Sequence, residues 1–370
     1  MRIGIDARMI DWSGIGRYTE SLITGIKKFA ADVEPVLFCN QNNSHRIPGG
    51  NAFKRHYINT PVFALDAPIR LAGKLKPYEI ELYHSPHFVV PSGKAIYPIV
   101  VTIHDLTPLV IKQTMPHALH RRYYYLANRL ACRKAAKIVA PSQSTKSDIE
   151  RILGVPGDKI EVIYEGVHNV FRKISEKQVG EVKGKFAIKG GYIFALGNQK
   201  PNKGIEYLID AFYKLTSSQG LKHELILTGS PSDKFKGAQS RITRYGLEHK
   251  VRLIGKVTDD ELIALYSGAS VFVFPSLYEG FGLPPLEAMA CEVPVVASNR
   301  SSVPEVVGDA ASIVDPSQVD ELADAIIEAI EDESLRSRLV ENGLKRIKDF
   351  SLEKFTRETV MVYKQALENA

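Results

Sequence analysis

The 370-residue chain is poor in cysteine and contains no long apolar run. Cys39, Cys132 and Cys291 are odd in number, widely spaced and outside any CxxC pair. This pattern excludes a disulfide framework or a cysteine zinc site and is typical of reduced core thiols in a cytoplasmic protein. No segment approaches the ~20 apolar residues of a membrane-spanning helix, and MRIGIDAR at the start lacks the pattern of a signal peptide.

Two common nucleotide-binding motifs are incomplete. SGIGRYTE (13–20) contains Gly14 and Gly16, but Thr19 stands where GxGxxG needs its third glycine. GNQKPNKG (197–204) has no Ser or Thr after its lysine, so it is not a GxxxxGK[ST] loop. These absences argue against a nicotinamide cofactor and against P-loop chemistry.

No metal site is predicted either. A DxD pattern at a strand end is missing, and Asp259 and Asp260 are better explained as acidic residues at a helix start. His84 and His87 in YHSPHF (83–88) have no carboxylate nearby in sequence, and we interpret them as core or cleft histidines.

The composition is that of a soluble globular protein, with 44% hydrophobic and 24% charged residues. A chain of this length fits two domains of ordinary size. The net charge of +6 is unevenly distributed, because residues 1–180 hold 25 Lys/Arg and 15 Asp/Glu, whereas residues 181–370 hold 23 and 27. The basic first half either meets an anionic partner or is simply solvated by its Lys and Arg.

Both halves open with a strand, a glycine-containing loop and an amphipathic helix. The first runs from MRIGIDARMI into RYTESLITGIKKFA, and the second from GYIFALG (191–197) into IEYLIDAFYKL. Further short apolar strands are predicted at 98–103, 137–142, 159–164, 223–229, 251–255, 270–276 and 293–298. Helical patterns lie between them, including 258–269 with Thr258 as its N-cap. This alternation predicts an α/β protein with two doubly wound parallel sheets.

The segment FPSLYEGFGLPPLEAMACEVPVV (274–296) reads as strand, glycine loop and helix start. Its Glu279 and Glu287 can accept hydrogen bonds from sugar or ribose hydroxyls, and Lys203 precedes another helix where a diphosphate would be stabilised. Taken alone, Glu287 is equally well explained as a carboxylate that complements a helix dipole, and Glu279 as a solvated residue of a turn. Together with the EGFGLP loop, they favour a nucleotide site.

EGFGLPPLE resembles the E-x7-E motif of the retaining glycosyltransferases of family 4, which have the GT-B fold. SGIGRYTESL, TIHDLTPL (102–109) and LGNQKPNKGIEYLIDAF (196–212) resemble further motifs of that family, and the similarity covers nearly the whole chain. It is strongest toward members that transfer mannose in surface-polysaccharide assembly. The resemblance implies two Rossmann-like domains facing each other across a cleft, an acceptor domain at 1–178 and a donor domain at 179–350. The boundary would lie in the polar segment 172–190, and the helix at about 351–370 would pack back on the first domain.

The resemblance also implies roles for single residues. Glu287 would hold ribose hydroxyls, Glu279 the hydroxyls of the transferred sugar, and Lys203 the diphosphate. The implied catalytic residues are His104, Glu279 and Lys203, with His104 beside the transferred sugar. A structural hydrogen bond at a strand end is the alternative for His104, but a strand's carboxyl end favours a site role. The implied donor-binding residues are Gly14, Asn198, Lys203, Leu253, Glu279, Gly280, Phe281, Gly282, Leu283 and Glu287.

The acceptor-side candidates are Gly16, Arg17 and Asp105. One departure from the family concerns the diphosphate, since many relatives carry Arg where this chain has Asn202 or Asn198. The diphosphate would then meet one fewer cation in this chain.

The implied reaction is transfer of a hexose, mannose from GDP-mannose, to a glycan or lipid-linked acceptor with retention of configuration and without a metal or cofactor. A UDP-sugar donor, a nicotinamide-dependent oxidoreductase and an inactive nucleotide-sugar-binding protein remain alternatives. The basic segment 117–137 either contacts the inner face of the cell membrane or is an ordinary surface helix. Nucleic-acid binding is not predicted, because no reading motif accompanies the basic residues.

Overall fold

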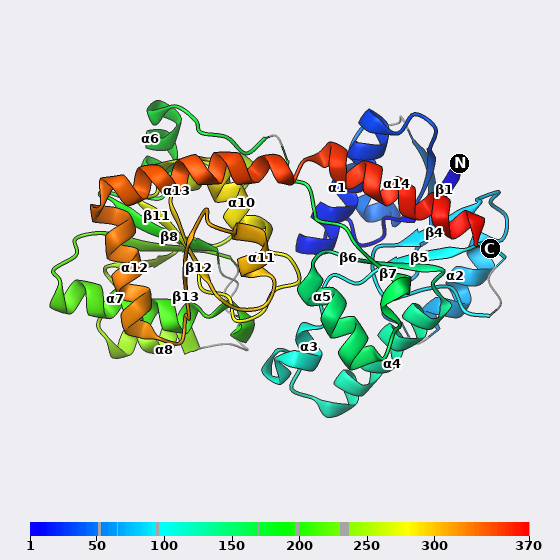
Figure 1. Cartoon of the computed structure of the whole chain (residues 1–370), viewed down its shortest axis with the longest axis horizontal. Helices are drawn as coiled ribbons and strands as arrows, with labels where there is room; N and C mark the ends of the chain where they lie inside the picture. Colours follow the sequence, from blue (N-terminus) through cyan, green and yellow to red (C-terminus); the bar gives the residue numbers. More distant parts are fainter. Residues whose placement is uncertain are drawn as a thin grey trace. The chain divides into compact units, whose positions relative to one another are not determined.

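A computed structural model describes residues 1–50, 53–64, 66–93, 96–168, 170–196, 200–229 and 237–369. They form two compact units, shown in Figure 1. The first contains Met1–Val110, Met115–Gly166 and Phe350–Ala370, and the second contains Ile111–Thr114 and Val167–Asp349.

The chain passes from the first unit into the second after Gly166, earlier than the boundary predicted within 172–190. That segment contains helix α6 (Glu176–Lys185), which packs on α9 (Asp259–Gly268) of the second unit. Just before α6, the Lys173 ammonium donates to the carbonyl of Ser267 in α9 at 2.6 Å. These contacts explain why the segment belongs to the second unit.

The described part of the first unit contains a seven-stranded sheet in the order β3-β2-β1-β4-β5-β6-β7, with every neighbouring pair parallel. The strands are β1 (Arg2–Asp6), β2 (Glu34–Cys39), β3 (Lys54–Tyr57), β4 (Leu82–Ser85), β5 (Ile99–Thr102), β6 (Lys137–Ala140) and β7 (Ile160–Val162). The strand order reverses between β1 and β4, which are neighbours in the sheet.

Helices cover both faces of this sheet, as parallel strands require. One apolar core joins it to α1 and α14, and a second joins it to α2, α4 and the turn after α5. The helices are α1 (Ser13–Phe29), α2 (Ala67–Leu75), α3 (Thr107–Val110), α4 (Ala118–Lys134), α5 (Gln143–Asp148) with its π-helical continuation Ile149–Leu153, and α14 (Leu352–Glu368). The last helix thus returns to the first unit and lies along α1 (Figure 1).

The second unit contains, among its described residues, a six-stranded parallel sheet in the order β10-β9-β8-β11-β12-β13. Its strands are β8 (Tyr192–Leu196), β9 (Glu224–Thr228), β10 (Val251–Leu253), β11 (Val271–Phe274), β12 (Val295–Ser298) and β13 (Ser312–Val314). Here the order reverses between β8 and β11.

Helices also lie on both faces of the second sheet. On one face α7, α8 and α12 form the main core, and on the other α9 and α10 pack on β8, β11 and β12. The helices not yet given bounds are α7 (Ile205–Ser218), α8 (Gly237–Arg244), α10 (Leu283–Ala290), α11 (Val303–Val307), α12 (Val319–Glu331) and α13 (Glu333–Arg346).

These two sheets confirm the predicted α/β doubly wound architecture, and each strand predicted from an apolar run is present. Thr258 caps α9 as predicted, because its side chain accepts from the amide of Glu261. Two separate helices, α12 and α13, follow β13, since Asp332 caps α13 immediately after α12 ends. The three cysteines are free and buried. No helix in the described ranges combines the length and apolar character needed to cross a bilayer.

A buried histidine joins the C-terminal helix to the first sheet. His84 Nδ1 lies 2.7 Å from the Tyr363 hydroxyl of α14, and Nε2 lies 2.8 Å from Thr102 Oγ1 of β5. Thr102 Oγ1 is also 2.9 Å from the Tyr18 hydroxyl of α1. Burial lowers the pKa of His84 to about 3, with the neighbouring His104 and His87 adding to the effect.

This histidine makes stability fall as the pH drops. Unfolded His84 binds a proton below about pH 6.5, whereas the folded residue stays neutral down to about pH 3. We therefore expect it to reduce the free energy of unfolding by up to about 1.4 kcal/mol per pH unit below 6.5. The lowered pKa of Asp6, caused by Arg8 and His87 against the opposing effect of burial, acts only below its unfolded value of 3.8.

Urea unfolding at about pH 7 and about pH 5 measures the effect. Trp12, the chain's single tryptophan, reports on the first unit. His84→Gln is expected to show a shallower pH dependence than the parent chain. Equal pH dependence in both chains would contradict the assignment.

Candidate functional site

The candidate site of the second unit lies where its strand order reverses. β8 and β11 are adjacent, so the loops that follow them leave the same edge of the sheet. In doubly wound sheets, ligands bind at this position, outside the carboxyl ends of the strands. Lys203 follows β8 and Glu279 follows β11, and Lys203 Nζ lies 2.7 Å from Glu279 Oε1. Two predicted catalytic residues are therefore in direct contact.

The Lys203–Glu279 pair is partly open to solvent, with the side chains 21% and 15% exposed. Lys203 Nζ also lies 5.7 Å from the centre of the Phe274 ring at the end of β11. The carboxylate and the ring together hold the ammonium in one place, at the edge where an anionic ligand would enter.

The loop before α7 is tied to the loop after β11. Asn202 is buried, its Nδ2 donates to the carbonyl of Tyr278 at 3.1 Å, and its own carbonyl accepts from the amide of Leu277 at 2.8 Å. Gly204 has a φ of +62°, and a Cβ there would lie 2.0 Å from the carbonyl oxygen of Pro275. Asn202 thus has a packing role in this chain. Asn198 lies outside the described residues.

The glycine loop runs from Gly280 into α10, which starts at Leu283. Gly282 precedes the helix with a φ of +110°, a conformation that favours glycine. The side chain of Phe281 is buried. This loop therefore leads the backbone from Glu279 directly to the start of α10, where the sequence predicts a nucleotide site.

Two serines that the sequence did not point to hold this loop. Ser301 Oγ donates to the carbonyl of Glu279 at 2.6 Å, and Ser302 Oγ donates to the carbonyl of Phe281 at 2.7 Å. Ser301 has a φ of +55°, unusual for a residue other than glycine. The available signal was a pair of polar residues that begins three positions beyond the strand predicted at 293–298. Their role became visible only from the adjacency of β11 and β12.

Glu287 lies in α10, and Leu253 lies at the end of β10. Because α10 begins at Leu283, Glu287 lies in the second turn of this helix. It is buried and accepts from the Tyr266 hydroxyl at 3.1 Å. Leu253 ends β10, two strands from β8, and packs partly into the core.

In the first unit, His104 follows β5. Its Nε2 carries the proton, because it lies 3.1 Å from the carbonyl oxygen of Pro86, which can only accept. Nδ1 faces Glu165 Oε1 at 3.6 Å, and the ring meets Tyr18 edge to face at 4.8 Å between centroids. Glu165, buried after β7, is a polar partner that the sequence did not identify, although it directly follows a predicted strand.

The remaining candidates of the first unit differ in their contacts and in their exposure to solvent. Asp105 Oδ1 accepts from the amide of Thr107, the first residue of α3, at 2.7 Å. A Cβ on Gly16 would lie 2.3 Å from the carbonyl oxygen of Ile10, so close packing requires this glycine. Gly14 is exposed in the first turn of α1, and a Cβ there would meet no described atom within 4 Å. Arg17, also in α1, is half-buried.

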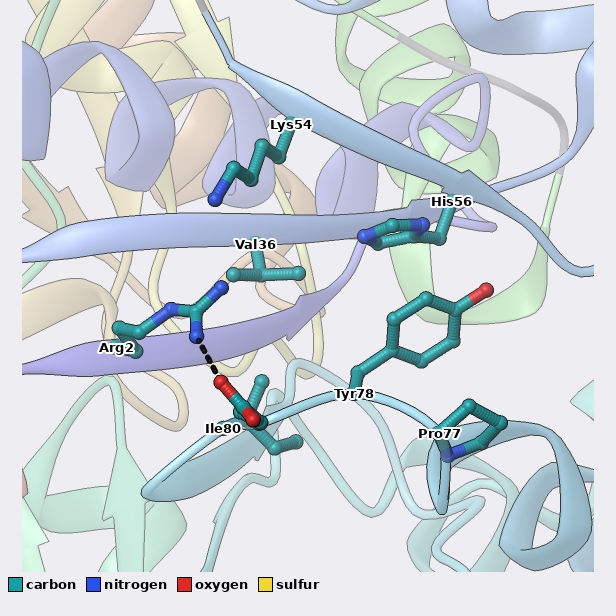
Figure 2. Close-up of a pocket in the computed structure, with 8 residues that line it drawn as sticks. Arg2, Val36, Lys54, His56, Pro77, Tyr78 and Ile80 are labelled. Atoms are coloured by element: carbon teal, nitrogen blue, oxygen red, sulfur yellow. Dashed lines mark hydrogen bonds and ion pairs between the residues drawn. The ribbon is translucent and has the colours of Figure 1, made fainter.

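A pocket of about 260 Å³ in the first unit is lined by none of these residues (Figure 2). Arg2 and Val36 of β1 and β2, Lys54 and His56 of β3, and the segment 77–80 before β4 line it. Within the described ranges, no three His, Cys, Asp or Glu side chains gather to hold a metal ion.

Family comparisons agree with the two-unit description. A family described as Glycosyltransferase Family 4 matches residues 12–169, and one described as Glycosyl transferases group 1 matches residues 180–346. The O-antigen chain mannosyltransferase B of Escherichia coli is 32% identical over 368 residues, covering 95% of this chain and 96% of that protein. The serotype-specific mannosyltransferase WbdA of Escherichia coli is 31% identical over 274 residues, covering 72% of this chain and 34% of WbdA.

The crystal structure of Anabaena HepE in complex with UDP and glucose resembles this chain with a TM-score of 0.80 at 21% identity, covering 98% of this chain and 99% of HepE. The two doubly wound units are thus those of the GT-B fold of glycosyltransferases. Given the matches over both units and the 32% identity across nearly the full length, the chain belongs to glycosyltransferase family 4.

Proposed function

We propose that this chain transfers mannose from GDP-mannose to a hydroxyl of a surface-polysaccharide acceptor, retaining the anomeric configuration. The observation that carries the proposal is the Lys203–Glu279 pair at the reversal point of the second sheet, in a family 4 chain. Mannose is chosen because the relatives similar to this chain include an O-antigen mannosyltransferase and WbdA. A UDP-sugar is the second candidate donor, since HepE was crystallised with UDP and glucose.

In this proposal the second unit binds the donor. The diphosphate draws the Lys203 ammonium toward itself, and Glu279 then accepts hydrogen bonds from the sugar hydroxyls. The amides from Gly280 to Leu283 at the start of α10 stabilise negative charge on the departing diphosphate. Glu287 accepts hydrogen bonds from the ribose hydroxyls, either in addition to the bond from the Tyr266 hydroxyl or in place of it.

The first unit supplies the acceptor side and His104. With Nε2–H engaged by Pro86 and Nδ1 facing Glu165, the ring is fixed in orientation beside Tyr18. His104 then positions the transferred sugar, while the departing phosphate accepts the proton of the attacking hydroxyl. The protein contributes positioning and charge stabilisation, and no metal takes part.

A thermal-shift panel of GDP, UDP, ADP and NADH without added metal tests the donor. A ligand at 100 times its Kd adds about 2.7 kcal/mol of stability, which is readily seen. We expect GDP to raise Tm most and EDTA to leave the shift unchanged. A shift with NADH alone would overturn the proposal in favour of an oxidoreductase. With GDP-mannose and an acceptor, NMR of the product then reports whether the configuration is retained.

Helix α4 supports membrane contact as part of the same proposal. Its side chains Leu119, Tyr123, Leu126 and Leu130 are 76%, 37%, 51% and 52% exposed and recur at helical spacing on one face. Arg122 and Arg133 are exposed beside this stripe. Such a face suits an anionic lipid surface, into which leucines insert while arginines meet headgroups.

Replacing Leu119 and Leu126 by Ser is expected to lower binding to phosphatidylglycerol vesicles at least about tenfold, because two partly inserted leucines are lost. Co-sedimentation measures the bound fraction. Ile69→Ser is the matched control, since Ile69 is 67% exposed on α2. Equal loss in both variants, or binding of the parent chain to neutral phosphatidylcholine alone, would contradict the assignment to α4.

A further inference from the structure

A four-residue turn after β12 holds a serine in a conformation that favours glycine. The amide of Val303 donates to the carbonyl of Arg300 at 3.2 Å and so closes the turn. Ser301, its second residue, has a φ of +55°, and Ser302, its third, has a φ of −78° and a ψ of −10°. Turns with a positive φ at the second position are usually built with glycine there, because a Cβ makes this conformation costly. The serine at position 301 is therefore not explained by turn formation.

The same turn is anchored to the edge strand β13 and to the residue that follows it. The amide of Asn299 donates to the carbonyl of Val314 at 2.8 Å. The guanidinium of Arg300 pairs with Asp315 at 2.5 Å. The second sheet thus sets the place of Ser301 independently of the glycine loop.

The Ser301 hydroxyl meets both backbone polar groups of Glu279. Its Oγ donates to the carbonyl of Glu279 at 2.6 Å and accepts from the amide of Glu279 at 3.3 Å. One hydroxyl can make both bonds, because it has one O–H and two lone pairs. Ser302 Oγ lies 3.0 Å from the same carbonyl and 2.7 Å from that of Phe281. The backbone of Glu279 is therefore tied to the turn after β12.

A fixed backbone at Glu279 determines where its carboxylate can reach. The next residue is Gly280, and a glycine gives the main chain more conformational freedom than any other residue. The Glu279 side chain is 15% exposed, and its Oε1 lies 2.7 Å from Lys203 Nζ. Holding the main chain before a ligand arrives lowers the entropy cost of placing this carboxylate against sugar hydroxyls. Strained residues such as Ser301 persist where neighbouring contacts hold them, and they are frequent at functional sites.

We infer that Ser301 is a positioning residue for Glu279. Its hydroxyl holds the main chain of Glu279 so that the carboxylate meets the hydroxyls of the transferred sugar. The inference rests on the proposed function, because that proposal gives Glu279 its role toward the sugar. The hydroxyl at position 301 offsets the cost of the positive φ, which a glycine would avoid.

Ser301→Gly tests this inference, because it removes the hydroxyl and relieves the conformation. Isothermal titration of the full chain with GDP and with GDP-mannose measures the two Kd values. We expect the Kd of GDP-mannose to rise at least about tenfold and that of GDP to change less than about threefold, since only the sugar loses a placed partner. The Tm is expected to stay within about 4 °C of the parent value, because the lost hydrogen bonds and the relieved conformation oppose each other. UDP and UDP-glucose replace these ligands if the thermal-shift panel selects UDP.

Three further variants separate the hydroxyl from the conformation. Ser301→Ala removes the hydroxyl but keeps a Cβ at positive φ, so we expect the same loss of GDP-mannose affinity with a lower Tm than Ser301→Gly. Ala187→Gly is the matched control, since Ala187 has a φ of +49° after α6 in the same unit. It is expected to bind both ligands like the parent chain. In a Glu279→Gln background, Ser301→Gly is expected to raise the Kd of GDP-mannose less than about threefold, because the positioned carboxylate is already gone.

Equal weakening of GDP and GDP-mannose in Ser301→Gly would show a merely structural role and overturn the inference. Parent affinity in either Ser301 variant, an equal loss in Ala187→Gly, or a full further loss in the Glu279→Gln background would also overturn it. A parent chain that binds no nucleotide, or a Glu279→Gln variant with parent affinity for GDP-mannose, refutes the proposed donor site itself. If the parent chain and Glu279→Gln behave as proposed while Ser301→Gly binds GDP-mannose normally, only this inference fails.

Discussion

Glu279→Gln is expected to lower kcat by about 10²–10³ while changing the free energy of unfolding by less than about 1 kcal/mol. Glutamine keeps the shape of the side chain but removes the charge that holds Lys203, whose Nζ lies 2.7 Å away. It also donates where sugar hydroxyls would donate, so the interaction with the transferred sugar is lost at the reacting end of the donor. Stability changes little, because partly exposed ion pairs contribute only about 0.2–1 kcal/mol.

Steady-state kinetics with the donor identified by the thermal-shift panel measure this effect, and urea unfolding measures stability. Glu261→Gln is the matched control, since Glu261 pairs with Lys185 in the same unit but away from the glycine loop. It is expected to keep the parent kcat. If Glu279→Gln and Glu261→Gln have equal activity, Glu279 has no part in transfer.

Gly204→Ala is expected to destabilise the second unit by more than about 3 kcal/mol. At Gly204, φ is +62° and a Cβ would lie 2.0 Å from the carbonyl oxygen of Pro275. The left-handed conformation alone costs about 1–2 kcal/mol for alanine. Relief of the overlap moves either the start of α7 or the end of β11, and both hold the loops that position Lys203 and Glu279.

Gly220→Ala separates these two costs. Gly220 follows α7 with a φ of +68°, but a Cβ there would meet no described atom within 4 Å. We expect this variant to lose only about 1–2 kcal/mol, the cost of the conformation. Urea denaturation followed by far-UV circular dichroism compares the two variants. Equal losses would show that the approach of Pro275 to Gly204 has no energetic consequence.

Sequence patterns alone determined the architecture of this protein. Apolar runs such as 270–276 and amphipathic stretches such as the one from Ile205 onward have periods that only strands and helices satisfy. Their alternation leads to parallel sheets, because each crossover helix must cover a sheet face. The EGFGLP loop and Lys203 could be placed at strand ends for the same reason.

Other features depended on contacts between distant segments, which no local period encodes. Ser301 and Ser302 reach Glu279 and Phe281 only because β11 and β12 are neighbours in the sheet. From the resemblance, Asn202 stands where many relatives have an arginine for the diphosphate. In the structure Asn202 is buried and donates a hydrogen bond to the carbonyl of Tyr278.

In the first unit, too, the sequence located single residues but not the contacts between them. The sequence placed His104 at a strand end, but its partner Glu165 follows β7, two strands away in the sheet. A polar pocket of the first unit is lined by Asp11, Asn43 and Asn59, from three loops that meet because β1, β2 and β3 are adjacent. The sequence by itself therefore determined the elements and the residue types at their ends, through periodicity and turn chemistry. Only the tertiary structure decided which ends meet, because strand order is set by the packing of whole sheets and helices.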